Sequence, residues 1–251
     1  MKNKVSIRFY EELNYFLDKK YRKKRFETSF PNTATVKALI EDLGVPHTEV
    51  DLILINGNSV SLSCKLHNGD SISVYPVFET FDISEVTKVR NKPLRAVKFL
   101  ADVHLGKLTT YLRILGFDTF YSNNISDTEI SERSLKEGRI ILTRDLGILK
   151  RKIVTHGYYI RSRNPKEQLK EVINRFNLIN LIKPFSLCTR CNEPLIPIEK
   201  EKVSGKVPIF VYENYNNFNF CPKCKRIYWR GSHWENIRKL FNNIFPPDIK
   251  K

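Results

Sequence analysis

The sequence of 251 residues carries 43 Lys and Arg against 27 Asp and Glu, which gives a formal net charge of +16. Its hydrophobic fraction of 41% is enough for folded cores and excludes a wholly disordered chain. No apolar run approaches the roughly 20 residues of a membrane-spanning helix, and Glu11 and Glu12 exclude a secretory signal. We therefore expect a soluble, cytoplasmic protein with no membrane partner, and the basic balance points first to nucleic acid.

The positive charge is unevenly distributed along the chain. Residues 1–80 hold 11 basic and 10 acidic side chains, whereas residues 81–251 hold 32 and 17. This asymmetry predicts two domains with different roles, of which the second meets a polyanion. Basic surfaces also serve solubility, so charge alone does not establish nucleic-acid binding.

Residues 1–80 show the pattern of short strands around a single helix. Alternating or continuous apolar residues predict strands over residues 5–10, 26–30, 52–55 and 71–75. A helix is expected over residues 35–43, because its apolar residues fall on one face and Gly44 follows. Asn56-Gly57 and Asn68-Gly69 are strong turn signals.

This order of elements resembles the ubiquitin-like β-grasp fold of small sulfur-carrier proteins. The matching segments are residues 36–40, 54–57 and 68–76. Such carriers act through a free Gly-Gly C-terminus, whereas this strand continues past Pro76 into more protein, so carrier chemistry is not expected. We expect a module that docks onto a protein partner or presents RNA, with a structural appendage as the alternative. Residues 81–94 are polar and are expected to be a linker.

Residues 95–183 alternate between strand and helix patterns. Strands are expected over residues 96–100, 118–121, 139–143 and 158–160, and helices over residues 105–115, 126–136 and 165–176. This alternation predicts an α/β domain with a parallel sheet flanked by helices.

Acidic residues follow two of these strands. Asp102 and Asp145 come just after strand ends, where parallel sheets place their ligand sites. Clustered carboxylates are stable around a hard cation such as Mg²⁺ or Mn²⁺, which can activate water against a phosphodiester. The alternatives are structural: Asp145 could cap a helix or turn, and Asp127 lies in the capping-box pattern of Ser126 and Glu129.

Several basic residues near these acids are candidates for contacts with a nucleic-acid backbone. They are Lys107, Arg113, Arg144, Lys150, Arg151, Lys152, Arg161 and Arg163. For any one of them, solvated surface is the alternative.

Four of the five cysteines form two C-x-x-C pairs, Cys188 with Cys191 and Cys221 with Cys224. Two such pairs supply a tetrahedral four-thiolate site, for which Zn²⁺ is the expected metal. A closed four-cysteine site leaves no position for substrate, so its role is structural. The long separation of the pairs suits a zinc ribbon with an inserted hairpin; disulfides or a redox pair are the alternative. We expect Cys64 to be a small buried hydrophobe.

Residues 95–240 resemble the Mut-seven C-terminal RNase domain family, a PIN-like fold with an appended zinc ribbon. The resemblance lies in residues 99–118, Asp127, residues 138–145, the two cysteine pairs and residues 227–234. A preceding ubiquitin-like domain is a familiar partner of this family. The resemblance implies a ubiquitin-like domain at 1–80, a linker at 81–94, a PIN-like domain at 95–183 and a ribbon with its tail at 184–251.

The resemblance also implies a metal-dependent ribonuclease, and we expect its RNA partner to be single-stranded RNA or structured RNA ends. Asp102, Asp127 and Asp145 match the acids that hold Mg²⁺ or Mn²⁺ in PIN nucleases. Where some PIN domains place a fourth acid, this chain has Arg161 and Arg163, and Thr110 replaces a basic residue common in the family. Other classes that fit are a non-catalytic RNA-binding protein and a protein-docking adaptor.

The aromatic residues of the ribbon allow two interpretations. Tyr228, Trp229 and Trp234 could stack on unpaired bases or fill the small ribbon core. For His233, we expect a structural hydrogen bond rather than an RNA contact.

Overall fold

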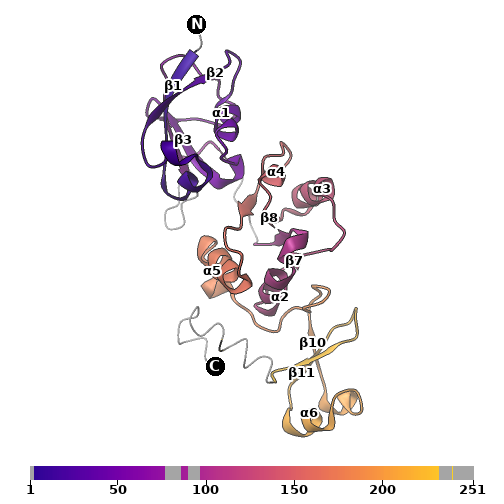
Figure 1. Ribbon diagram of the computed structural model, residues 1–251. Coiled ribbons are helices and arrows are strands. Elements are labelled where there is room, and N and C mark those ends of the chain that lie inside the picture. The colour runs from indigo at the N-terminus through magenta and orange to yellow at the C-terminus, as the bar shows by residue number, and fades with distance from the viewer. Residues whose placement is uncertain (1–2, 77–85, 90–96, 232–238, 240–251) are drawn as a thin grey trace. The chain divides into compact units, whose positions relative to one another are not determined.

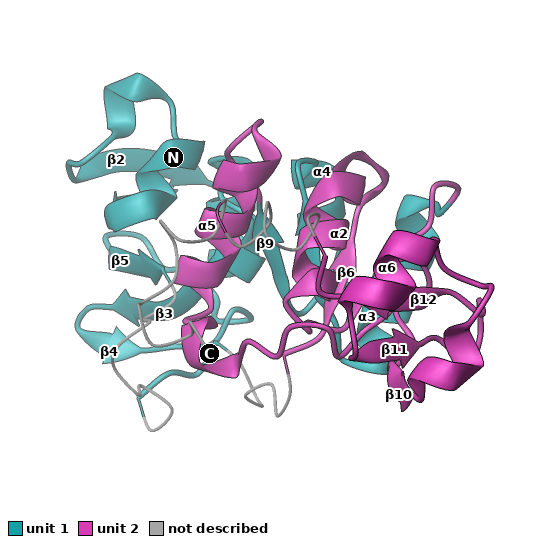
Figure 2. Cartoon of the chain, turned by 90° about the horizontal axis from the view of Figure 1, so that it is seen from below, with its two compact units in different colours: residues 1–96, 125–159 teal, residues 97–124, 160–251 magenta. Residues whose placement is uncertain are grey.

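The computed structural model describes residues 3–76, 86–89, 97–231 and 239 (Figure 1). The chain divides into two compact units, residues 1–96 with 125–159 and residues 97–124 with 160–251 (Figure 2). No helix in the described ranges is both long and apolar enough to cross a membrane. His233 and Trp234 fall outside these ranges, as does most of the expected linker.

The N-terminal part of the first unit is a five-stranded sheet of order β2-β1-β5-β3-β4, which confirms the expected β-grasp fold. Its strands are β1 (Asn3–Phe9), β2 (Phe26–Phe30), β3 (Val50–Ile55), β4 (Asn58–Ser59) and β5 (Ser71–Pro76). β1 and β5 are parallel, and the other pairs are antiparallel. Alternate residues, among them Val5, Ile7, Ile72 and Val74, are buried in one core with α1 (Val36–Asp42).

Local sequence signals determine the ends of these elements. Thr35 caps α1 by accepting a hydrogen bond from the Ala38 N–H at 3.3 Å. Asn56 and Gly57 have φ angles of 51° and 83°, as a tight hairpin between β3 and β4 requires. Three 3-10 helices were not expected from the pattern: η1 (Glu11–Phe16), η2 (Lys19–Tyr21) and η3 (His47–Glu49).

Part of the linker packs against the β-grasp domain. In residues 86–89, the Thr87 hydroxyl donates a hydrogen bond to the Asp51 carbonyl, and Val89 contacts the domain's apolar core. This segment is therefore attached to the sheet.

A second sheet has the order β7-β6-β8-β9, formed by β6 (Phe99–Ala101), β7 (Thr119–Phe120), β8 (Ile140–Thr143) and β9 (Gly157–Tyr159). The pairs β6–β7 and β8–β9 are parallel, as expected. The helices of this part are α2 (Gly106–Ile114), α3 (Asp127–Glu137), α4 (Leu146–Leu149) and α5 (Pro165–Arg175). β6 and β8 are buried along their whole length, which is typical of a parallel sheet covered on both faces.

Helix ends in this part follow the sequence signals, whereas α4 was not predicted. Gly138 adopts a left-handed φ of 62° after α3. Gly116 ends the turn after α2 with φ of 88°. The four-residue α4 is too short to produce a helical period in the sequence.

The cysteine-rich part is a three-stranded antiparallel sheet of order β10-β11-β12. Its strands are β10 (Ile196–Ile198), β11 (Phe218–Phe220) and β12 (Ile227–Trp229). The connection between β10 and β11 contains η6 (Lys200–Val203) and α6 (Ile209–Asn214), so the inserted hairpin carries a helical arm. Trp229 packs against the small core of Val203, Val211 and Phe218, which supports the core interpretation for this aromatic residue.

Candidate functional site

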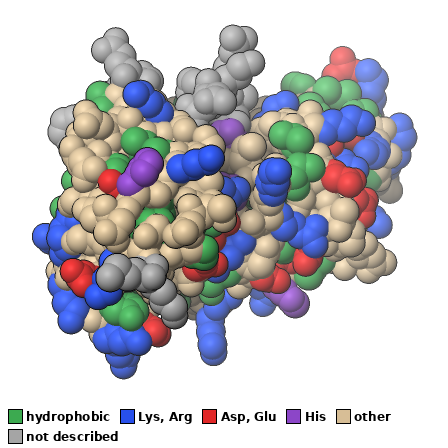
Figure 3. All heavy atoms as spheres, turned by 90° about the horizontal axis from the view of Figure 1, so that it is seen from above, with side chains coloured by type: hydrophobic (Ala, Val, Ile, Leu, Met, Phe, Trp, Pro, Cys, Tyr) green, Lys and Arg blue, Asp and Glu red, His purple; other side chains and the backbone are tan. Residues whose placement is uncertain are grey.

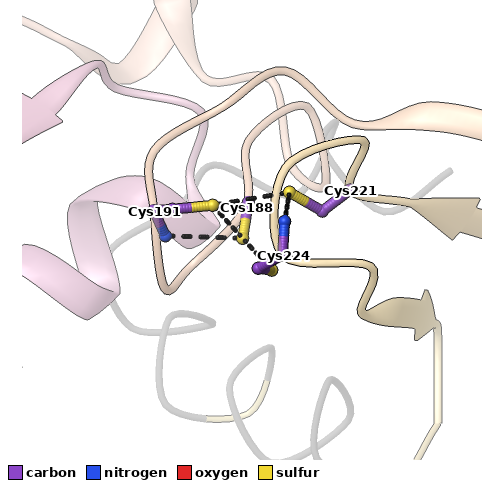
Figure 4. A group of neighbouring side chains, drawn as sticks. All are labelled: Cys188, Cys191, Cys221 and Cys224. Atoms are coloured by element: carbon purple, nitrogen blue, oxygen red, sulfur yellow. Dashed lines mark hydrogen bonds between the residues drawn. The ribbon is translucent and has the colours of Figure 1, made fainter.

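The four cysteines converge in one cluster (Figure 4). Their Sγ atoms all lie within 4.8 Å of one another. Adjacent Sγ atoms are separated by 3.5 Å for Cys188–Cys224, 3.3 Å for Cys188–Cys191 and 3.4 Å for Cys191–Cys221. A tetrahedral ion with bonds of about 2.3 Å to sulfur would need separations of roughly 3.8 Å, so a small adjustment suffices. The cluster can therefore hold a metal ion.

The two cysteine pairs form nearly identical turns. In each pair, the N–H of the second cysteine lies 3.5 Å from the first cysteine's Sγ, as donor to that sulfur. The residue after each pair has a left-handed φ, 64° at Asn192 and 60° at Lys225. These turns direct both sulfurs of a pair toward one point, as metal coordination requires.

The protonation of the thiols shows why the cluster favours a cation. Burial raises the pKa of the Cys188 thiol, but hydrogen bonds from Tyr228 and from backbone N–H groups outweigh it and lower the pKa to about 6. Burial and hydrogen bonds with Cys188 and Cys221 raise the pKa of Cys191 to about 12. Without a bound cation, these pKa values favour a thiolate at Cys188 and a protonated thiol at Cys191. All five cysteines are free, so the disulfide alternative finds no support.

A buried arginine attaches the first cysteine pair to the α/β part. Arg113 on α2 is only 5% exposed. Its Nε donates to the Thr119 carbonyl at 2.9 Å, and its Nη1 donates to the carbonyls of Thr189 and Arg190 at 3.0 and 2.8 Å. These two carbonyls belong to the turn between Cys188 and Cys191. Arg113 is therefore a structural residue, and its expected RNA contact is not supported by this position.

Asn192 strengthens the same junction from the other side. Its Oδ1 accepts the Thr119 N–H at 2.9 Å, and its Nδ2 donates to Asp118 Oδ1 at 2.5 Å. The first cysteine turn is thus bonded to β7 and, through Arg113, to α2.

The candidate catalytic acids lie at the starts of helices. Asp102 follows β6 and is 5% exposed. Asp145 follows β8 and caps α4, because its Oδ1 accepts the Gly147 N–H at 2.6 Å. Asp127 is the exposed first residue of α3, which Ser126 caps through the Glu129 N–H at 3.3 Å. Ser126 and Asp145 therefore cap α3 and α4, and neither cap uses the carboxylate of Asp127 or the second oxygen of Asp145. Asp127 and Asp145 belong to the first unit and Asp102 to the second, so their convergence stays a prediction.

A hydrogen bond links the neighbourhoods of two of these acids. Arg151 Nη1, just after α4, donates to Thr128 Oγ1 in the first turn of α3 at 3.1 Å. Asp127 precedes Thr128, and Asp145 begins α4. The bond therefore ties the first turn of α3 to the segment after α4.

The other basic candidates differ in their surroundings. Lys150 donates from Nζ to the Glu41 carbonyl at 2.8 Å, and the Arg161 guanidinium lies 3.7 Å from Glu171. Arg144 and Arg151 are half-buried, whereas Lys107, Lys152 and Arg163 are exposed. The latter three have the access that a phosphate contact needs. Lys and Arg side chains are spread over the visible face in Figure 3, interrupted by acidic ones.

Sequence reasoning missed an attachment of the β-grasp domain to β9, the last strand of the second sheet. The Tyr159 N–H donates to Glu49 Oε1 at 2.7 Å, and this glutamate is fully buried. His47 lies between Glu41 and the Val154 carbonyl, with Nδ1 2.6 Å from Oε1 and Nε2 2.7 Å from the carbonyl oxygen. No local pattern signals these contacts, because they join residues about 110 positions apart in the chain.

Replacing Arg113 by Met should destabilise the protein by about 3 kcal/mol, because buried carbonyls lose a charged donor while the aliphatic volume remains. Thermal denaturation measures this loss. The variant should also release metal from the cysteine cluster to a chelator faster than wild type.

The matched control is Arg190→Met, which removes an exposed guanidinium from the same turn. It should change neither stability nor metal release appreciably. Equal behaviour of the two variants would contradict the structural role of Arg113.

Comparisons with known proteins agree with this architecture. A family model described as Mut7-C RNAse domain matches residues 97–241, and one described as Mut7-C ubiquitin matches residues 2–82. Searches of curated proteins and of solved structures return no match. The first family model covers more than half of the chain, including both cysteine pairs and all three candidate acids. The chain therefore belongs to the Mut7-C RNase domain family, with a ubiquitin-like domain before the RNase domain.

Proposed function

We propose that the protein is a metal-dependent ribonuclease that hydrolyses RNA phosphodiesters in RNA processing or turnover. The observation that carries this proposal is the RNase family match over residues 97–241. Asp102 and Asp145 lie within it, Asp102 directly after β6 and Asp145 two residues after the end of β8. Parallel sheets bind their ligands beyond the carboxyl ends of their strands.

Asp102, Asp127 and Asp145 would hold Mg²⁺ or Mn²⁺. The donor set consists of oxygens alone, which suits these hard cations. Capping of α4 uses one oxygen of Asp145, and a monodentate metal contact needs only one. When bound, the ion supplies an activated water and neutralises charge at the phosphate. The hydrogen bond between Arg151 and Thr128 supports the approach of Asp127 to Asp145, because it joins the first turn of α3 to the segment after α4.

The RNA backbone would be held by exposed basic residues of the α/β part. Lys107 lies in the first turn of α2, five positions after Asp102. Lys152 and Arg163 follow α4 and β9. Single-stranded RNA and RNA ends are the expected substrates, because a flexible strand can bring its phosphates to cations that are separated in the structure.

The metal of the cysteine cluster is proposed to be a structural Zn²⁺. Four sulfurs fill a tetrahedral coordination sphere and leave no position for substrate. Free thiols in all five cysteines suit a reducing compartment, so we place the protein in the cytoplasm.

A second candidate function is RNA binding without cleavage. It is favoured by Arg161 and Arg163, which follow β9 where some PIN domains carry a fourth acid. A further alternative is an adaptor, in which the ubiquitin-like domain docks onto a protein partner. Both alternatives predict that RNA stays intact in the presence of Mn²⁺.

The variants Asp102→Asn and Asp145→Asn should cleave RNA roughly 100-fold or more slowly than wild type with Mn²⁺, since each loses a charged metal ligand. Glu132→Gln is the matched control, because it neutralises an exposed acid on α3. Gel analysis of a labelled single-stranded RNA measures the rates. Unchanged cleavage by both Asp variants would show that the site is misassigned.

Binding of Zn²⁺ to the metal-free protein at pH 7 should release at least about two protons. The pKa of Cys191 is raised to about 12 and that of Cys224 is also raised, so both enter binding as thiols that must ionise. Zinc affinity should therefore increase with pH. Titration calorimetry in buffers of different ionisation enthalpy counts the protons, and a count of zero would contradict four-thiolate coordination.

A further inference from the structure

The open face of the β-grasp sheet has an unusual composition. On the adjacent strands β1 and β5, the side chains opposite the core are Lys4, Ser6, Arg8, Ser71, Ser73 and Tyr75. This set contains no acid and no aliphatic residue. On the neighbouring strand β2, Glu27 stands opposite Ser6, and its Oε2 lies 3.6 Å from Lys4 Nζ.

Aromatic rings on this face form a stack. Tyr10, directly after β1, lies parallel to Tyr75 on β5, with ring centroids 4.3 Å apart and an interplanar angle of 11°. The Arg8 guanidinium lies 4.8 Å from the Tyr10 centroid. Both tyrosines are half-buried, so part of each ring remains accessible. Among the described residues, the shielded Nε of Arg8 has no hydrogen-bond partner.

A second arginine extends the polar surface beside the stack. Arg25 Nη1 donates to the Ser71 hydroxyl at 3.0 Å, and its Nη2 donates to the Ser73 hydroxyl at 3.0 Å. Further bonds from Nη1 to the carbonyls of Ser6 and Ile72, both 3.2 Å, fix the guanidinium over the sheet. Two cations and a row of hydroxyls thus adjoin two stacked aromatic rings.

We propose that this face, centred on Arg8, Tyr10 and Tyr75, binds single-stranded nucleic acid by base stacking, with Arg8 and Arg25 near the phosphates. Unpaired bases stack on aromatic rings and guanidinium planes, and nearby hydroxyls can bond to sugars and phosphates. The two guanidinium groups and the stacked rings favour nucleic acid over a protein partner, and the aliphatic side chains that β3 adds opposite Tyr75 and Ser73 are the buried Leu52 and the half-buried Leu54.

This inference rests on the proposed function in taking RNA as the polymer. The β-grasp face would hold a single strand through residues other than the three candidate acids. The near-neutral first 80 residues would then contribute to RNA binding through stacking more than through net charge.

Fluorescence anisotropy tests the proposal on the full chain, with a labelled oligouridine of about 12 nucleotides and no added Mg²⁺ or Mn²⁺. Tyr75→Leu should weaken binding roughly tenfold, because a base loses its stacking partner. Tyr75→Phe should bind like wild type, because it keeps the ring. Equal affinity of wild type and Tyr75→Leu would overturn the proposal, as would a wild-type chain that does not bind.

A matched pair of charge variants separates the site from general electrostatics. Arg8→Gln and Lys20→Gln each remove one positive charge from the same domain, and Lys20 lies over a different ring, that of Tyr21, at 4.7 Å. Only Arg8→Gln should weaken binding severalfold. An equal loss in both variants would overturn the assignment of the face.

Photo-crosslinking of wild type with 4-thiouridine RNA decides the question if Tyr75→Leu fails to fold. Crosslinks at Tyr10 or Tyr75 support the proposal, and crosslinks confined to residues 97–231 overturn it. Cleavage of the same strand with Mn²⁺ separates the two proposals. Binding through this face without cleavage contradicts the ribonuclease, whereas cleavage with Tyr75-independent binding contradicts only the face.

Discussion

The buried guanidinium of Arg113 is the interaction on which the second unit depends. It satisfies backbone carbonyls of β7 and of the turn between Cys188 and Cys191, from a position that is only 5% exposed. A charge so deeply buried is stable only when its donors are paired, so this geometry cannot relax without a large cost. Asn192 adds bonds to the same strand. The cysteine cluster is thus bonded into the α/β part.

Through this junction, a metal ion held by the four cysteines would act on the RNase domain. Such an ion would hold the first cysteine turn, which is bonded to Arg113 on the helix that follows Asp102. The RNase family model accordingly spans the α/β part and both cysteine pairs as one match. On this account, the structural metal supports the proposed catalytic site from a distance, while the acids at the strand ends perform the chemistry.

Local patterns predicted much of this structure, and long-range contacts explain the rest. The bounds of β2, the cap of α3 at Ser126 and the cysteine pairs are encoded within a few residues, so the sequence reveals them. The short α4 has no helical period, and the contacts of Arg113 and Glu49 reach about 76 and 110 positions along the chain. Only folding places such partners together, which is why Arg113 resembled a surface cation in the sequence.

We propose that Asp102, Asp127 and Asp145 share one divalent cation. Substoichiometric Mn²⁺ added to the zinc-loaded, isotope-labelled protein tests it through paramagnetic broadening of backbone amide signals. The amides of these three residues and their immediate neighbours should broaden together at the lowest Mn²⁺ concentration. Broadening that spares any one of the three, or that starts at acids elsewhere on the surface, would contradict it.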